Sequence, residues 1–417
     1  MVKRFIVLVG ILFSSFLWAQ NGTSSPYSYY GIGEIKYRDG FENTNMGGMA
    51  VYADSIHLNL QNPAANASLK LTTFTIGGSN NWNTLKSNSG EGQTQRTTLD
   101  FLAVGLPFGK LGMNFGLMPF TSVGYKSRNT FTENNQDVTQ LFEGEGGINR
   151  VFMSFGYEIT KSLSVGATIN YDFGNIETKN SEFITGIETG TRELDRSTLN
   201  GFMSNFGLMY KKPINKKLVG YGSFTYAPEA KLNAANTRTL STVAFSATFG
   251  ELVVDNENII VPNRTIVIPS KLSFGAGIGE TNKWMAGAQF TTQLSGNLDN
   301  RFNDVQNATF EPAYQISVGG FFVPKYNSFS SYISRITYRA GLRYENTGLI
   351  IQNESITDFG TTFGLGLPLG GPFSKVNLGF EVGKRGTTNQ NLVQEDYYNL
   401  TVGFTINDKW FQKIKYD

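Results

Sequence analysis

The sequence of 417 residues contains no cysteine and only one histidine, His57. Without cysteine the chain has no disulfide framework, and a single histidine does not complete a typical zinc site. A serine nucleophile needs a base within hydrogen-bond reach, which histidine usually supplies, but no hydrolase motif surrounds His57. We therefore interpret His57 as a packed or solvated structural side chain, and we expect neither an enzyme nor a metal centre.

Long hydrophobic runs are also missing beyond the first twenty residues. The chain starts with Lys3 and Arg4, continues with an apolar run over 5–17, and reaches Ala19, which is the layout of a cleaved secretory signal over residues 1–19. The run is shorter than the about 20 residues that a transmembrane helix needs. These features exclude a helical membrane protein and predict an exported chain.

Charge is scarce and nearly balanced. Charged residues make up 16% of the chain and the net charge is +2, whereas ordinary soluble domains carry about 25% charged residues. No basic run is interleaved with aromatic residues, so binding to nucleic acid is not expected. Glycine, with 47 residues, and aromatic residues, at 13%, are abundant instead. Few charges with many glycines and aromatics are typical of strands that lie against lipid.

From Leu69 onward, apolar and polar side chains alternate with a period of two residues. In the clearest hairpin, large apolar side chains alternate with small or polar ones: Val151, Met153, Phe155, Tyr157 and Ile159 against Arg150, Ser154, Gly156 and Glu158. Bands of about nine to eleven such residues are the signature of membrane β-strands. We count fourteen segments of this kind, near 69–79, 98–107, 112–124, 149–159, 163–174, 201–211, 218–227, 271–279, 284–294, 312–323, 333–346, 356–367, 376–385 and 396–406.

The predicted fold is all-β, a transmembrane antiparallel β-barrel of about 14 strands over residues 67–406, followed by a tail over 407–417. Alternate connections are short, and the others are expected to be long loops around 80–97, 125–148, 175–200 and 228–270. This division, with an even number of strands, places both termini in the periplasm of a Gram-negative bacterium. An additional hairpin within 228–270 stays open. A soluble sandwich or propeller is disfavoured, because so many exposed apolar faces would aggregate in water.

Residues 20–66 have neither the helical nor the strand period. Two short turns punctuate them, Asn45-Met46-Gly47-Gly48 and Asn62-Pro63-Ala64. Irregular backbone at membrane depth survives only where it is buried in protein or faces water. We therefore expect 20–66 to form a plug inside the barrel lumen, with an ordinary turn-rich linker as the alternative.

A Gly-rich turn and then an Asn-Pro-Ala triplet, placed before such strands, resembles the plug of the FadL/OmpP1/TodX family of outer-membrane barrels. The resemblance implies a passive transporter in the outer membrane, without a cofactor, for hydrophobic small molecules such as fatty acids, with lateral release through the barrel wall. It also implies that the plug motif consists of Asn45, Gly47, Gly48, Asn62, Pro63 and Ala64. The family's extracellular ligand-binding residues are not matched one by one.

The third predicted strand carries Pro119 in an otherwise regular alternation. Proline has no amide hydrogen to donate to the ladder, so it belongs at an edge or a bulge. The family resemblance implies an inward kink in this strand that opens a lateral exit to the bilayer. A harmless bulge near a membrane interface is the alternative at Pro119.

Charged residues on inward-facing positions suggest two interpretations. Arg339, Arg343, Glu345, Glu381 and Arg385 form either a selectivity array in the lumen or a set of pairs that satisfies the barrel wall.

Two other patterns resemble ligand sites only superficially. Oxygen-rich clusters at 255–258 and at Asp299, Asn300, Asp304 and Asn307 lack the spacing of a calcium loop, so solvated extracellular loops are preferred. Gly275, Gly277 and Gly279 imitate a dinucleotide fingerprint but open no helix, and we assign them to inward positions where the wall must stay thin.

Two functions from different classes remain. The first is uptake of a hydrophobic small-molecule ligand with release into outer-membrane lipid. The second is a non-transporting barrel that serves as a subunit or scaffold of an outer-membrane secretion or assembly complex. The tail supports the second to some extent, because Trp410, Phe411, Lys413, Lys415 and Tyr416 suit an interfacial anchor or a periplasmic docking segment.

Overall fold

The structure is a computed structural model, and it describes residues 22–36, 39–246, 250–296, 298, 300–302, 307–369 and 374–410. The predicted signal segment and most of the tail, including Phe411, Lys413, Lys415 and Tyr416, lie outside the described residues. Within the described part of the chain, no helix is both long enough and apolar enough to cross a membrane.

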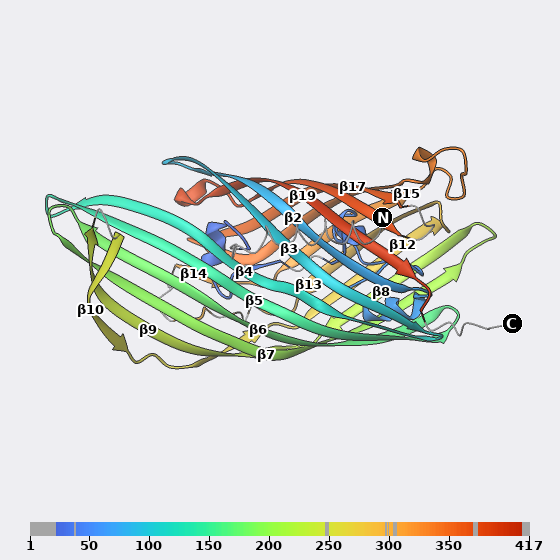
Figure 1. Cartoon of the computed structure of the whole chain (residues 1–417), viewed down its shortest axis with the longest axis horizontal. Helices are drawn as coiled ribbons and strands as arrows, with labels where there is room; N and C mark the ends of the chain where they lie inside the picture. The colour runs from blue at the N-terminus through green and yellow to red at the C-terminus, as the bar shows by residue number, and fades with distance from the viewer. Residues whose placement is uncertain are drawn as a thin grey trace, which may run out of the picture.

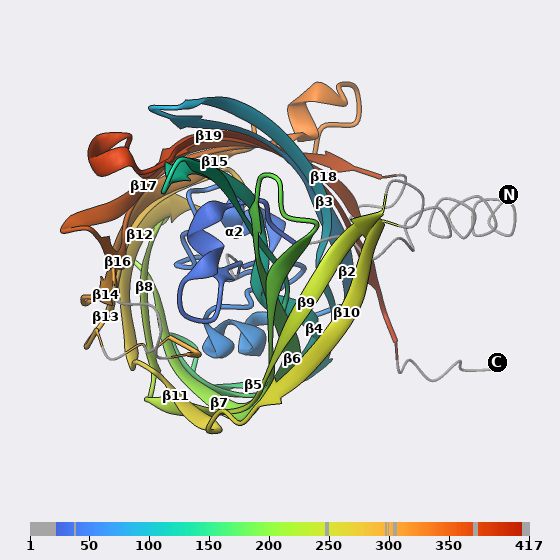
Figure 2. The ribbon, with the colours of Figure 1, turned by 90° about the vertical axis from the view of Figure 1, so that its left-hand side faces the viewer.

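The strands close into an antiparallel barrel of fourteen strands, which confirms the predicted fold class (Figures 1 and 2). Ten barrel strands are single elements, namely β2 (Thr72–Ser87), β3 (Gly90–Phe108), β4 (Leu111–Glu133), β5 (Gln136–Thr160), β6 (Leu163–Ile184), β7 (Thr189–Pro213), β13 (Trp284–Gln293), β16 (Thr337–Ile351), β17 (Glu354–Pro368) and β18 (Lys375–Arg385). The last strand, β19 (Gln394–Asp408), pairs with β2 and closes the barrel.

The remaining three barrel strands are interrupted along their length. They consist of β8 (Leu218–Ala227) with β9 (Ala230–Ser246), of β10 (Gly250–Ile259) with β11 (Arg264–Ile268) and β12 (Lys271–Glu280), and of β14 (Ala308–Phe310) with β15 (Tyr314–Phe322). The pieces of one strand follow each other along the same neighbour, since β8 and β9 both pair with β7.

The outer face of the barrel is apolar at the predicted positions. Val151, Met153 and Tyr157 are exposed on β5, whereas Arg150 and Ser154 between them are buried. Every barrel strand has a neighbour on each side along at least part of its length, so the sheet closes on itself. An apolar outer belt on a closed ladder is the arrangement of a transmembrane β-barrel.

The prediction of long loops over 80–97, 125–148 and 175–200 is wrong. These intervals continue the strands as tall hairpins, and the β4–β5 hairpin turns only at Asn134 and Asn135, both with positive φ. The apolar alternation fades there because side chains beyond the lipid have no need to be apolar, although the ladder continues. The interval 228–270 contains the hairpin of β9 and β10, which extends existing barrel strands without adding to their number.

A luminal segment, residues 22–36 and 39–71, lies inside the barrel (Figure 2). It contains the 3-10 helix η1 (Pro26–Tyr29), the two-residue strand β1 (Glu34–Ile35), the short helix α2 (Phe41–Thr44) and the 3-10 helix η2 (Pro63–Ser68). Two further 3-10 turns, η3 (Ile333–Arg335) and η4 (Asn389–Asn391), lie in connections between strands. The buried apolar side chains of the luminal segment pack against the inner wall, as Phe41 and Leu60 do in one cluster with Phe101 of β3.

Candidate functional site

The Gly-rich turn follows α2 and lies against the inner face of the wall. Gly47 has a φ of 72°, its N–H donates to Thr362 Oγ1 at 2.9 Å, and its carbonyl accepts from Ser317 Oγ at 2.8 Å. A Cβ on Gly47 would stand 2.6 Å from the carbonyl oxygen of Leu342, so no larger residue fits there. Gly48 also has a positive φ, and its N–H donates to Asn43 at 2.9 Å.

The Asn-Pro-Ala triplet begins η2 and holds it against the opposite side of the wall. Asn62 Oδ1 accepts from the N–H of Ala64 at 3.0 Å, which caps the 3-10 helix, and Pro63 occupies its first turn. The Asn62 amide also donates to the carbonyl of Leu208 at 3.0 Å and to Ser223 Oγ at 2.8 Å. Asn62 and Ala64 are fully buried, so this turn joins the luminal segment to β7 and β8.

A ring of inward-facing glycines surrounds the luminal segment. A Cβ added to any of thirteen wall glycines would come within 3.2 Å of a luminal-segment atom. The ring consists of Gly77, Gly105, Gly112, Gly156, Gly166, Gly207, Gly275, Gly287, Gly319, Gly341, Gly364, Gly379 and Gly403, one from each uninterrupted strand and from β12, β15 and β19. The fourteenth strand contributes Ser223, which binds Asn62. Much of the glycine content of the chain thus provides space for the luminal segment.

The glycine ring explains why both turns contact the wall so closely. Asn45, at the end of α2, packs on Gly364 and Gly379, whose absent side chains leave room for its amide. Neighbouring ring members often face each other in the ladder, as Gly112, Gly156 and Gly166 do on β4, β5 and β6. The luminal segment is therefore in contact with every side of the barrel at one level.

The wall is incomplete between β3 and β4. Their ladder runs only from the pair Phe108 and Leu111 to the pair Leu102 and Leu117. Beyond it, β3 continues to Gly90 along β2, and β4 continues to Glu133 along β5, but no pairing joins the two strands there. Figure 1 shows the β2–β3 hairpin and β4 diverging, with the luminal segment visible between them.

Pro119 lies where β4 leaves its regular course. The register of β4 against β5 shifts between Pro119 and Thr121. After this point both faces of β4 are buried, because every residue from Phe120 to Tyr125 is buried. A strand with two buried faces has left the lipid-facing surface and lies against the luminal segment.

Part of the luminal segment occupies the edge that β4 exposes. Glu34 and Ile35 of β1 pair with Ser122 and Thr121 of β4, and the N–H of Lys36 donates to the carbonyl of Phe120 at 2.9 Å. This short pairing takes the position that β3 would fill in an unbroken wall.

A cavity of about 1470 Å³ lies at the break in the wall. One part of its lining, called the lower lining below, is apolar. It consists of Phe41 and Leu60 of the luminal segment with Phe101 and Met118 of the wall. Its lining also includes Leu99 of β3, whose side chain is exposed and which lies beyond the last β3–β4 pair. The cavity therefore borders the break between β3 and β4.

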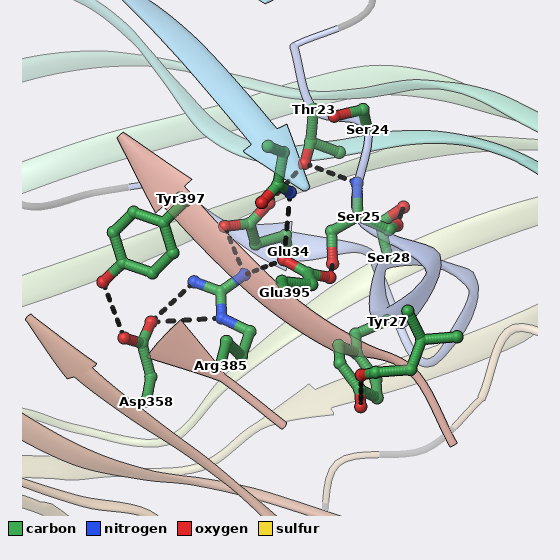
Figure 3. A network of polar contacts seen from close by, with 12 residues as sticks. Thr23, Ser24, Ser25, Tyr27, Ser28, Glu34, Asp358, Arg385, Glu395 and Tyr397 are labelled. Carbon is green, nitrogen blue, oxygen red and sulfur yellow. Dashed lines mark hydrogen bonds and ion pairs between the residues drawn. The ribbon is translucent and has the colours of Figure 1, made fainter. Parts of the chain in front are cut away.

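Buried charges fix the start of the luminal segment to β18 (Figure 3). Arg385 donates to Glu34 at 2.7 Å and, through two nitrogens, to Asp358 of β17 at 2.8 and 3.1 Å. Burial opposes ionisation of Glu34, but Arg385 and Lys36 hold the pKa of its carboxyl well below the usual range. Ser25 donates to Glu395 in the same network. These contacts position β1 beside β4.

The other inward charges have hydrogen-bond partners within the barrel wall. Arg343 donates to Glu345 at 2.8 Å, to Asp358 at 3.3 Å and to Glu381 at 3.0 Å, and Arg339 donates to Asn377 at 3.3 Å. Of the five inward charges predicted from the sequence, Glu381 and Arg385 line the cavity. These contacts favour a structural role, in which the charged side chains are neutralised within the barrel wall, over a selectivity array.

His57 lies in a partly buried contact between the luminal segment and the wall. Its Nδ1 is 2.5 Å from Asp54 Oδ2 and its Nε2 is 3.4 Å from Lys375 Nζ. Burial opposes ionisation of Asp54, but the adjacent His57 holds the pKa of its carboxyl well below the usual range. The His57 side chain thus links the luminal segment to Lys375 of β18.

Oxygen-rich clusters form no metal site among the described residues, where no group of three or more acidic, histidine or cysteine side chains is placed to hold an ion. Asp255 and Asn258 lie on β10 at an exposed hairpin. Asn300 Oδ1 accepts from the N–H of Gly31 at 2.7 Å, and Asp299 and Asp304 lie outside the described residues.

Sequence reasoning missed β1 and the polar wall of the cavity. Glu34 and Ile35 carry no strand signal, because two residues are too few for a period. The polar wall had a signal, since Ser79, Asn81 and Asn83 alternate with outward residues on β2 just above its apolar part.

Solved structures with a similar fold include two toluene transporters and a FadL homologue. The Pseudomonas putida toluene transporter TodX is 14% identical with a TM-score of 0.58, covering 90% of this chain and 98% of that one. The Ralstonia pickettii toluene transporter TbuX is 14% identical with a TM-score of 0.55, covering 91% and 99%. A Pseudomonas aeruginosa FadL homologue is 12% identical with a TM-score of 0.56, covering 90% and 98%.

These similarities confirm the predicted FadL-like barrel fold. None of these three structures is described as an enzyme. No curated protein sequence matches the chain. The family model described as BamG matches residues 1–417, the whole chain, and the chain therefore belongs to the BamG family.

Proposed function

We propose that the chain is an outer-membrane channel for passive uptake of hydrophobic small molecules, the class that includes fatty acids. The ligand enters the cavity from outside and leaves sideways into the bilayer between β3 and β4. The observation that carries this proposal is the cavity of about 1470 Å³ that meets the break in the wall.

A lateral exit is supported by the way the luminal segment is seated. Contacts with the glycine ring surround it at one level, which opposes a straight path along the barrel axis. The apolar lower lining, with Phe101 and Met118, borders the break, so an apolar ligand stays in apolar surroundings as it moves toward lipid. In this proposal Pro119 bends β4, and the plug-motif residues hold the luminal segment against the wall.

The printed descriptions of similar structures agree with this class of ligand. TodX and TbuX are described as toluene transporters, and another barrel of this fold is described as the CymD monoaromatic hydrocarbon channel. At identities of 12–14% such proteins support the proposal by their shared fold.

Uptake by intact cells tests the proposal. Cells that produce the protein should take up radiolabelled toluene and 1-decanol faster than cells without it, whereas uptake of a small sugar should stay the same. Thr44→Trp, which fills the cavity, should remove the gain, and Thr130→Trp at the exposed end of β4 should keep it. Equal uptake of both apolar solutes with and without the protein would refute transport.

A second candidate, a barrel subunit of an outer-membrane complex, is favoured by exposed apolar side chains in two places. The connection between β15 and β16 exposes Phe329 (103%) and Ile333 (68%), and Trp410 is exposed beyond β19. Co-purification in mild detergent distinguishes the candidates. A stoichiometric partner that is lost in a Phe329→Ser and Ile333→Ser double variant supports the subunit role, whereas a lone barrel that transports supports the channel.

A further inference from the structure

Polar side chains cover one wall of the cavity in register. On β2 they are Ser79, Asn81 and Asn83, and directly opposite on β19 they are Thr401, Asn399 and Tyr397. Arg96 of β3 stands opposite Asn81 on the other side. Hydroxyl, amide and guanidinium groups therefore form adjoining rows on three neighbouring strands, above the apolar lower lining.

Several atoms in these rows have no hydrogen-bond partner within the described protein. They are Asn83 Oδ1, Asn399 Oδ1, Thr401 Oγ1 and Arg96 Nε. Asn83 and Thr401 are each only 6% exposed, so solvent reaches little of either side chain. A buried polar group without a partner costs free energy, and such groups mark places where a partner is supplied from elsewhere. Two of these atoms accept hydrogen bonds, one is a hydroxyl, and one donates.

The charge of the cavity opposes an anionic ligand. Among the described residues that line it, seven are acidic and four are basic; the acids are Glu34, Asp39, Asp100, Glu145, Glu177, Glu381 and Glu395, and the bases are Lys36, Arg96, Arg196 and Arg385. Three of the bases already form ion pairs, with Glu34, Glu177 and Asp358 as partners. A carboxylate in this cavity would lie among more acids than bases, whereas an uncharged group avoids that repulsion.

We propose that the cavity binds uncharged amphipathic molecules whose polar end carries several hydroxyl groups, and that it selects them over fatty-acid anions. The hydroxyls donate to Asn83 and Asn399 and accept from Arg96, with the amides turning about their terminal bonds to meet them. The alkyl part lies on Phe41, Leu60, Phe101 and Met118 and points toward the break between β3 and β4. This inference rests on the proposed uptake function and specifies its substrate class.

Three probes with the same ten-carbon chain test the polar end alone: decyl glucoside, 1-decanol and decanoate. The full-length protein is held in nanodiscs, and binding is measured by titration calorimetry against empty nanodiscs, which removes partition into lipid. Decyl glucoside should bind at least about tenfold more tightly than decanoate, and decanol should lie between them, since it offers fewer hydrogen bonds.

Variants of the polar rows then locate the contact. Asn83→Leu and Asn399→Leu should each weaken decyl glucoside about fivefold, as expected for one lost hydrogen bond, and should leave decanoate unchanged. Asn233→Leu, at an exposed position on β9 outside the cavity, is the matched control. Heat-modifiable migration on a gel verifies that each barrel is folded.

The possible outcomes distinguish a failure of this inference from a failure of the proposed uptake function. Tighter binding of decanoate, or equal weakening of all three probes in a folded Asn399→Leu barrel, overturns the selection of hydroxyl-bearing ligands and leaves uptake of hydrophobic molecules in place. Binding of none of the probes by the folded wild-type protein overturns both.

Discussion

Glu34 Oε1 accepts a hydrogen bond of 2.7 Å from Arg385 and thereby connects the luminal strand β1 to the barrel wall. The same carboxylate accepts from Thr23 at 2.5 Å, and Lys36 lies 2.9 Å from it. Arg385 keeps Asp358 as a second partner when Glu34 is neutral. Glu34 is therefore the charge that holds β1 in place beside β4.

We predict that Glu34→Gln loosens residues 22–36 without disturbing the barrel. A hydrogen bond between charged groups contributes about 1.5–3 kcal/mol, so amide exchange over this stretch should rise roughly tenfold or more. Hydrogen–deuterium exchange with mass spectrometry measures it. Glu145→Gln removes an acid from the same cavity without touching β1 and should leave the exchange as it is. Unchanged protection in Glu34→Gln would show that the ion pair does not hold the strand.

Because the glycine ring lies so close to the luminal segment, adding one methyl group to a ring glycine should destabilise the seating of that segment. A Cβ on Gly341 would lie 2.2 Å from the carbonyl carbon of Met46, which is backbone and does not move aside as a side chain does. Gly341→Ala should displace the Gly-rich turn, destabilise its seating by about 1–3 kcal/mol and raise the conductance of the barrel in planar bilayers. Gly92→Ala, at a site with nothing within 4 Å, should behave as wild type. Equal conductance of the two variants would mean that the ring does not seat the segment.

Pro119 is predicted to keep the wall open. Pro119→Val restores an amide hydrogen at the point where the register of β4 shifts, which favours a regular ladder and a narrower break. Uptake of an apolar solute should slow several-fold while its binding to the purified protein stays the same. Pro107→Val, within the regular part of the β3–β4 ladder, is the control. Wild-type uptake by a folded Pro119→Val barrel would leave this proline as a bulge only.

Asp39 is predicted to make the luminal segment sensitive to pH. Burial raises the pKa of its carboxyl to about 7, against the hydrogen bonds that it accepts from Asn43, Gly40 and Leu60. Below about pH 4 the group is protonated whether or not the segment is seated, so it imposes no penalty. Between about pH 4 and pH 7 the Asp39 carboxyl is protonated in the seated segment but ionised in the unseated one. The free energy that favours seating therefore falls by about 1.4 kcal/mol per pH unit over this range.

Exchange protection over residues 39–62, corrected for the intrinsic rate, should therefore be higher at pH 5.5 than at pH 8. Asp39→Asn keeps an oxygen for Gly40 and Leu60 and lacks the titrating proton, so its protection should be flat across this range. A pH-dependent loss of the same size in Asp39→Asn would assign the effect to another group.

The barrel could be predicted from the sequence because lipid requires apolar outward side chains, whereas inward side chains are small or polar. Outward positions such as Val151 and Met153 must be apolar, so all fourteen strands appear at their places along the chain. Beyond the lipid that contrast disappears. The tall hairpins of β4–β5 and β6–β7 therefore looked like loops, although their ladders continue.

The site was readable only in part, since it depends on contacts between residues far apart in the chain. Gly47 and Asn62 stood out because a Gly-rich turn followed by an Asn-Pro-Ala triplet, placed before such strands, resembles the plug of a known barrel family. Glu34 did not stand out, because its importance comes from Arg385, which is 351 positions away. The break in the wall was equally hidden, since Pro119 indicates a disturbed ladder but not the direction in which the strand bends.

The central claim is that ligand leaves through the break between β3 and β4. The chain has no cysteine, so Leu99→Cys provides a single thiol at the break, and a benzyl methanethiosulfonate reagent adds a bulky group there as a disulfide. Phe274→Cys, outward-facing and exposed on β12, receives the same group away from the break. We predict that modification at 99 stops uptake of radiolabelled toluene and that reduction restores it, with no effect at 274. Full uptake by completely modified Leu99→Cys protein would contradict lateral exit.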